Sequence, residues 1–254
     1  MLLKNCRLIP QLSDDIPFST ADISIADGKI EKVRPASGTP PLSDEIDCHG
    51  MTVLPGLFDL HVHLYSEREP NDLYHAFQLY HRQAPLLNTF LDHGVTTIRD
   101  CGSTMQLACY LRDGVNQGLF DGPRIFACGH ILSPEAMRHT GEGGAHFIAN
   151  GVDEVTKAAR YEFANGADFI KIYSTQSMSQ VNGQDPKCIY SADEIIAMVA
   201  VARNHHSYVA SHAHSTDAIN TCIRCGVRSI EHATYMDEES IRLFSEHPDA
   251  YAVP

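Results

Sequence analysis

From residue 54 onward, the chain alternates short apolar segments with longer amphipathic ones, and this pattern constrains the fold more than any other feature. The apolar segments are expected to be strands at 56–62, 95–99, 124–128, 168–173, 207–212, 227–231 and 250–253. Helices are expected at 72–92, 104–117, 153–165, 192–204, 215–225 and 237–246. This alternation predicts βα units and a parallel sheet. The strand count, without a glycine-rich dinucleotide motif after the first strand, favours an α/β fold of the TIM (β/α)8 barrel type over a doubly wound sheet.

The ends of several expected helices carry local signals. Ser191 followed by Glu194 forms a capping box at the start of one helix. Gly94, Gly166 and Gly226 each follow a helical stretch and precede a strand, where a C′ glycine belongs. These signals support the expected helix boundaries.

The first 54 residues have a different pattern, that of short strands and turns. Residues 21–26 alternate apolar and polar side chains, Asp27-Gly28 follows, and residues 29–33 alternate again. A strand, an Asp-Gly pair and a second strand predict a β-hairpin. Residues 35–41 are expected to be a loop, and 46–53 return to strand character. The chain is therefore expected to divide into 1–54, a strand-rich segment, and 55–254, the barrel.

Composition excludes several classes of protein. With 19 basic and 32 acidic residues, the net charge is −13, which argues against binding to nucleic acid or an anionic membrane surface. No apolar run reaches the roughly 18 residues that a membrane span needs, and the N-terminus lacks the apolar core of a signal peptide. The eight cysteines are scattered, which indicates reduced thiols in a cytoplasmic protein. The single CxxC, at Cys222 and Cys225, is interpreted as buried thiols rather than a redox or zinc motif.

Histidine, present 15 times, is placed unevenly. Several histidines and one lysine fall at the ends of expected strands, where a TIM barrel has its active site: His61, His63, Lys171, His212, His214 and His232. The i, i+2 spacing within each pair puts both rings on one face of a strand. Each feature has an ordinary explanation alone, since paired strand histidines can be structural. A lysine between Ile170 and Ile172 is costly to bury unless it is neutralised, paired or linked to a metal. Together the residues predict a metal site.

Five segments together resemble the amidohydrolase superfamily. They are PGLFDLHVH (55–63), GVTTIRD (94–100), GADFIKIY (166–173), ASHAH (210–214) and SIEH (229–232). The set most resembles the branch with prolidase-like, imidazolonepropionase-related and ochratoxin-type amidases. The resemblance covers nearly the whole chain, and it implies that residues 1–54 belong to a small β-sandwich beside the barrel.

The resemblance also implies a centre with two divalent metal ions. His61 and His63 would bind one ion, and His212 and His232 the other. Lys171 would be carboxylated to a carbamate that bridges both, which turns a buried cation into an anionic ligand. Zinc is the default metal for these ligand types, with manganese, cobalt or iron as alternatives.

Four further residues are candidates to contact substrate. Tyr173 shares a strand face with Lys171, and His214 shares one with His212; packed or structural roles are the alternatives. His139 and His146 lie in a long segment, 133–150, expected on the active-site side. The family usually has Gly-Gly-His here, whereas this chain has an Ala between the glycines and His146, so solvent-exposed histidines remain the alternative.

The resemblance implies hydrolysis of amide or peptide bonds in small substrates (dipeptide-like, Xaa-Pro or N-acyl amino acids) by a hydroxide that bridges the metals. The first alternative is an imidazolone-type hydrolase of cyclic amides with one metal. The second is a truncated, inactive metal-binding fragment. Family members use an Asp at the end of the eighth strand as general base, and Asp237 and Asp249 come too early for it. The chain is therefore expected to be a fragment whose eighth strand and general base lie beyond residue 254, and to associate with further copies of itself.

Overall fold

A computed structural model describes residues 1–14, 16–65, 73–134, 144–178, 181 and 183–254. The chain divides into two compact units, Met1–Gly56 and Leu57–Pro254. His139 lies outside the described residues. No described helix is long and apolar enough to cross a membrane.

The first unit is built on one four-stranded sheet, in the order β3-β2-β1-β4. Its strands are β1 (Leu2–Arg7), β2 (Thr20–Ala26), β3 (Lys29–Pro35) and β4 (Ile46–Asp47). The predicted hairpin is confirmed: β2 and β3 are antiparallel, and Asp27 and Gly28 both have positive φ, as a tight two-residue turn requires. A β-sandwich would need a second sheet, which the described residues of this unit do not contain.

The second unit alternates strands with helices along the chain. Its strands are β5 (Leu57–Val62), β6 (Val95–Asp100), β7 (Arg124–Ala127), β8 (Ile131–Ser133), β9 (His146–Ile148), β10 (Ile170–Tyr173), β11 (Val209–Ala213), β12 (Ser229–His232) and β13 (Tyr251–Val253). Its helices are α1 (Leu73–Gln83), α2 (Leu87–Asp92), α3 (Leu107–Asn116), α4 (Gly151–Ala164), α5 (Ala192–Asn204), α6 (Thr216–Arg224) and α7 (Glu238–Glu246). All its strand pairs are parallel, as predicted.

The helix expected at 72–92 is in fact broken. A 3-10 turn, Ala84–Leu86, separates α1 from α2. Pro85 lies in this turn, and a proline cannot donate the backbone hydrogen bond that a continuous helix needs there. The other helix ends agree with the sequence. Ser191 and Glu194 make the predicted capping box at the start of α5, and Gly94, Gly166 and Gly226 have positive φ.

The strands of the second unit form two sheets, with the strand orders β5-β6-β7 and β13-β12-β11-β10-β8-β9. The third barrel strand is interrupted between β7 and β8 at Gly129, which has a φ of +74°. Asp168 N donates to Ala127 O at 2.7 Å, so β7 runs beside the start of β10 and connects the two sheets. In the part of the chain that the structure describes, β5 and β13 are both edge strands.

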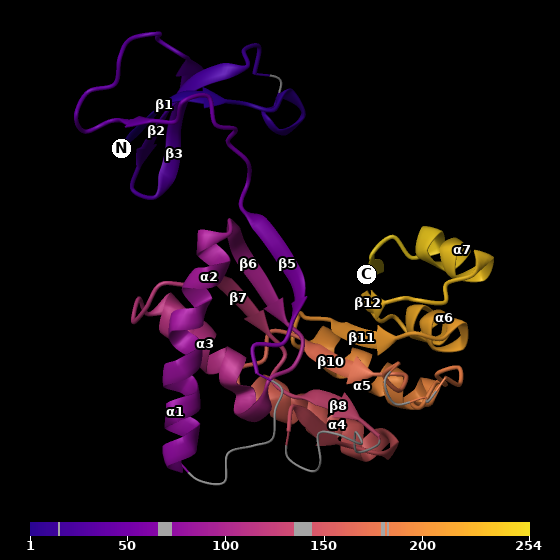
Figure 1. Cartoon of the computed structure of the whole chain (residues 1–254). Coiled ribbons are helices and arrows are strands. Elements are labelled where there is room, and N and C mark those ends of the chain that lie inside the picture. The colour runs from indigo at the N-terminus through magenta and orange to yellow at the C-terminus, as the bar shows by residue number, and fades with distance from the viewer. Residues whose placement is uncertain (15, 66–72, 135–143, 179–180, 182) are drawn as a thin grey trace. The chain divides into compact units, whose positions relative to one another are not determined.

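The helices cover the outer side of these strands (Figure 1). One apolar core joins β8 and β10–β12 to α4–α7, and another joins β6 and β7 to α1–α3. Apolar side chains on the outer strand faces thus pack under helices, and the carboxyl ends of the strands remain for polar residues. Cys222 is buried against the hydroxyls of Ser174 and Ser211, and the cysteines are free thiols.

Candidate metal centre

The strand-end histidines predicted from sequence converge from three strands. His61 and His63 lie at and just beyond the end of β5, with ring centroids 5.3 Å apart. The His61 ring is 4.9 Å from that of His232, at the end of β12, and the His232 ring is 4.7 Å from that of His212 on β11. Histidines separated by more than 150 positions in sequence thus form one cluster, because parallel strands end at one edge of the sheet.

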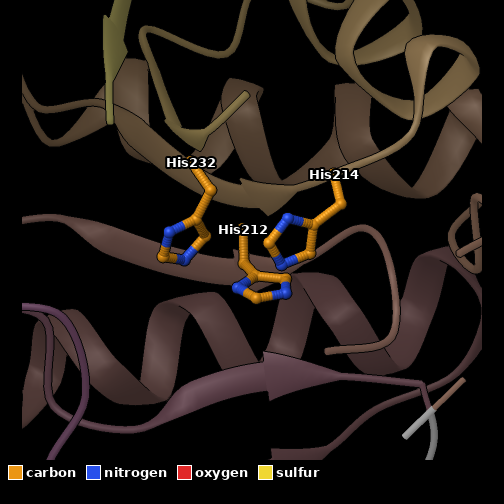
Figure 2. A group of neighbouring side chains, drawn as sticks. All are labelled: His212, His214 and His232. Carbon is orange, nitrogen blue, oxygen red and sulfur yellow. The ribbon is translucent and has the colours of Figure 1, made fainter. Parts of the chain in front are cut away.

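His212, His214 and His232 form the tightest part of this cluster (Figure 2). One ring nitrogen from each lies within 4.8 Å of the others, close enough for the three to share a metal ion. His214 is therefore beside the candidate ligands, with its ring stacked 4.9 Å from that of His232. Its Nδ1 hydrogen-bonds with Thr234 Oγ1 at 2.7 Å, which leaves Nε2 for the cluster.

Burial keeps these imidazoles neutral. It lowers the pKa of His212 well below its ordinary value and the pKa of His232 to about 4. His212 is 4% exposed, and neither of its ring nitrogens has a hydrogen-bond partner among the described residues. A neutral imidazole with a free lone pair is the form that binds metal, so a metal ion would satisfy this otherwise costly group.

The two β5 histidines are held by their Nδ1 atoms. His63 Nδ1 donates to Gly102 O at 2.9 Å, and His61 Nδ1 lies 2.7 Å from Glu231 Oε2. Burial lowers the pKa of His63 to about 4. With Nδ1 engaged in each ring, Nε2 is the atom left for a ligand.

Lys171 is fully buried on β10, and its Nζ has no hydrogen-bond partner in the described part of the chain. Its charge helps to depress the pKa of His63, His212 and His232, after the larger effect of burial. Nζ lies 5.0 Å from the centroid of the Tyr173 ring, a cation–π contact, but an ammonium without a hydrogen-bond partner is still costly to bury. A carbamate on Nζ would reverse the sign of the charge and supply oxygen ligands, so the donor set fits the implied metal centre.

Two candidate substrate residues lie beside the cluster. Tyr173 stacks on His212 with centroids 4.1 Å apart, and His146 meets the Tyr173 ring edge-on at 5.0 Å. His146 comes from β9, and its buried Nδ1 has no partner among the described residues. Burial lowers the pKa of His146 to about 4. Asp237, which comes too early in the chain to be the expected general base, has a structural role instead: its carboxylate caps α7 by accepting from Ser240 N.

A buried group of charged residues, not predicted from the sequence, lies beside the histidines. Arg99 donates to both oxygens of Glu231, and His61, Cys101 and Glu231 form a second group of potential ligands. Burial alone would raise the pKa of Glu231, but the hydrogen bond from His61 and the charge of Arg99 hold it below its ordinary value. Like Lys171, Arg99 and Glu231 are charged residues within strands of apolar character, and this is the signal in the sequence that could have identified them.

Asp100 supports the loop that follows β6. Its carboxylate accepts from Leu64 N, Gly102 N and Ser103 Oγ at 2.7–3.0 Å, and burial raises its pKa to about 6. These bonds fix Gly102, whose carbonyl in turn holds His63. Asp100 therefore orients one candidate ligand through the backbone.

The backbone is strained where β12 ends. His232 has a φ of +67° and Ala233 a φ of +45°, a region that residues other than glycine rarely adopt. Such outliers persist only where the surroundings enforce them, and they concentrate at functional sites. The turn directs the His232 ring into the histidine cluster.

A parallel α/β unit with histidines and a buried lysine gathered at its strand ends is typical of barrel enzymes that bind their substrates at this edge of the sheet. Comparison with known proteins identifies the family. The sequence profile of the amidohydrolase family matches residues 52–248, and the chain belongs to this family. The predicted family and TIM-type fold are thereby confirmed.

Individual relatives agree with this assignment. Ochratoxinase from Aspergillus niger is 27% identical over 94% of this chain and 55% of its own length. A prolidase solved with N-methylphosphonate-L-proline is 30% identical, with a TM-score of 0.82 over 100% of this chain and 65% of its own. A Xaa-Pro dipeptidase with bound methionine is 31% identical, with a TM-score of 0.81 over 100% and 66%. The chain thus spans between 55% and 66% of the length of these relatives.

Proposed function

We propose that this chain carries the metal centre of an amidohydrolase that cleaves the amide bond of small, dipeptide-like substrates. The observation that carries the proposal is the buried amine of Lys171, which lies beside neutral histidines and has no hydrogen-bond partner among the described residues. A purely structural core would replace such an amine with an apolar side chain of similar volume.

The proposed ligand set has two halves joined by Lys171. His61 and His63 would hold one divalent ion, and His212 and His232 the other, with His214 within reach of the second group. Lys171, carboxylated on Nζ, would bridge them. Bound divalent ions would supply Lewis-acid activation of water and of the scissile carbonyl. Zinc is the first metal to test, because imidazole and oxygen ligands suit it.

The chain's own residues contribute binding and orientation. We assign substrate contacts to His146 and Tyr173, which lie against each other next to His212. The unpartnered Nδ1 of His146 is available to a polar atom of the substrate. Similarity to a prolidase and a Xaa-Pro dipeptidase supports dipeptides with a C-terminal proline as the substrates to test first.

Metal content and turnover test the proposal separately. The purified chain is reconstituted with zinc and bicarbonate, and its metal content is measured beside that of Lys171→Ala. We expect two zinc ions per chain in the original and at least one fewer in the variant. Binding of no metal by the original chain would overturn the proposal.

Turnover is then measured on Xaa-Pro dipeptides, N-acyl amino acids and cyclic amides. Hydrolysis of the first two classes supports the proposed substrates. Hydrolysis of cyclic amides alone would instead indicate an imidazolone-type activity. Two bound metals without any turnover would mean that this chain binds metal but does not catalyse by itself.

A further inference from the structure

The Glu231 carboxylate is fully buried and accepts hydrogen bonds from side chains of three strands. Arg99 Nη2 donates to its two oxygens at 2.7 and 2.9 Å, and Ser229 Oγ donates to Oε1 at 2.5 Å. His61 Nδ1 lies 2.7 Å from Oε2. Arg99 also donates from Nε to Leu60 O at 2.6 Å, which ties the carboxylate to the strand that carries His61.

This arrangement determines which nitrogen of His61 carries the proton. Arg99 keeps its charge and bonds both oxygens of Glu231, so the carboxylate acts as an acceptor. Nδ1 of His61 must therefore donate, and a neutral ring then has its lone pair on Nε2. His63 has the same tautomer, with the proton on Nδ1, but for a different reason: its Nδ1 donates to the Gly102 carbonyl.

The two β5 histidines therefore differ in how their orientation is secured. The partner of His63 is main chain, which a side-chain substitution leaves in place. The partner of His61 is a side chain, itself held by Arg99 and Ser229. The orientation of His61 should thus depend on one carboxylate.

We propose that Glu231 is a positioning residue of the metal centre, which fixes His61 in the Nδ1-protonated tautomer and presents Nε2 to the metal. The inference rests on the proposed function and adds to it a residue outside the ligand set. Carboxylates that hold metal-binding histidines in this way commonly contribute ten- to a hundredfold to metal affinity.

The competing explanation is that Glu231 only completes a structural ion pair with Arg99. Glu162 provides a matched control. It is also fully buried, and its Oε1 lies 3.0 Å from His130 Nδ1, but it belongs to neither group of potential ligands. Replacement of either acid should cost stability, whereas only Glu231 should affect metal binding.

The test measures zinc affinity of the full chain by competition with a chromophoric chelator in buffer with bicarbonate. We expect Glu231→Gln to weaken one zinc equivalent ten- to a hundredfold, with the other equivalent and both equivalents of Glu162→Gln unchanged. Equal affinities in the original chain and Glu231→Gln would overturn the inference and leave the proposed function standing. Absence of zinc binding in the original chain would overturn the proposed function itself.

A second measurement covers the case in which Glu231→Gln fails to fold. Histidine ring nitrogens report their protonation in the 15N NMR spectrum of the metal-free original chain. The His61 signals are assigned by their loss in His61→Asn. We expect Nδ1 protonated and Nε2 bare, and the opposite tautomer would overturn the inference.

Discussion

At the scale of single residues, buried polar groups distinguish this chain from an ordinary barrel. Lys171, His212 and His146 each keep a buried nitrogen without a hydrogen-bond partner among the described residues. Groups of this kind lower stability unless a ligand satisfies them. Lys171 was evident from sequence, because apolar neighbours flank it. The pairing of Glu231 with His61 was not, because the two residues are 170 positions apart.

The cost of the buried amine can be measured. In metal-free, CO2-depleted buffer, Lys171→Met should raise the free energy of unfolding by about 1–3 kcal/mol, since it replaces a buried amine that lacks a hydrogen-bond partner with an apolar side chain. Urea denaturation measures the change. Lys157→Met is the control, because Lys157 lies on the exposed side of α4. It should change the free energy of unfolding by less than about 0.5 kcal/mol. A loss of stability in Lys171→Met would show that the amine is satisfied in the metal-free protein.

Gly129, between β7 and β8, is needed for two reasons. Its φ is +74°, and a Cβ there would lie 2.2 Å from Glu162 Oε2. Gly129→Ala should therefore cost about 1 kcal/mol for the backbone and about 2 kcal/mol more for the clash. Gly118→Ala is the control, because Gly118 has a φ of +69° and open space around it. Equal unfolding free energies for the two variants would exclude the clash.

At the scale of elements, most local sequence signals between neighbouring residues agree with the structure. The hairpin, the capping box of α5 and the strand ends all follow from short patterns. Pro85 also explains why the helix expected at 72–92 is divided. The interruption of the third barrel strand is different, because Gly129 makes room there for Glu162, a residue of α4.

The cap of α5 should contribute measurably to stability. Ser191 Oγ accepts from Glu194 N, and Glu194 in turn accepts from Ser191 N at 2.8 Å. Ser191→Ala should lower the free energy of unfolding by about 1 kcal/mol. Ser245→Ala in α7 is the control, since the Ser245 hydroxyl donates back to Ile241 O and caps no helix end. Its removal should not lower the free energy of unfolding. Thermal and urea denaturation of both variants check this difference.

Asp22 should make the first unit sensitive to acid. Burial opposes ionisation of its carboxyl, but hydrogen bonds from Ser37 N and Asn5 N and the charge of Lys4 hold its pKa below the ordinary value. A lowered pKa stabilises the fold above the unfolded value, 3.8, and this stabilisation is lost as pH falls through the folded pKa. Asp22→Asn should therefore be less stable than the original at pH 7 and approach it at low pH.

Urea denaturation is measured at a series of pH values from 7 downward. Local probes such as hydrogen exchange monitor the unfolding of the first unit. Asp44→Asn is the control, because Asp44 is exposed and should give a small difference at every pH. A difference for Asp22→Asn that stays constant to the lowest pH would contradict the assignment.

At the scale of the whole molecule, metal binding and folding should be coupled. The proposed ligands come from β5, β10, β11 and β12, so they meet only in the folded second unit. A ligand that binds only the native state stabilises it, by about 2.7 kcal/mol when the free ligand concentration is a hundred times the dissociation constant.

Zinc at about a hundred times its dissociation constant should therefore raise the unfolding temperature, and a chelator should reverse the effect. Calorimetry or circular dichroism checks this, with His61→Asn/His63→Asn as the variant that loses part of the gain. His205→Asn, at the exposed end of α5, should respond to zinc as the original does. An unfolding temperature that zinc leaves unchanged would contradict the coupling.

The sequence by itself determined the alternation of strands and helices, most of their boundaries, and the residue types gathered at the strand ends. These depend on local periodicity, caps and turns, which act over a few residues. Only the tertiary structure decided which side chains from different strands meet: His232 with His212 and His214, and Glu231 with His61 and Arg99. Contacts of that kind depend on strand register and on the direction of each side chain, and no local pattern encodes them across 18 to 170 positions.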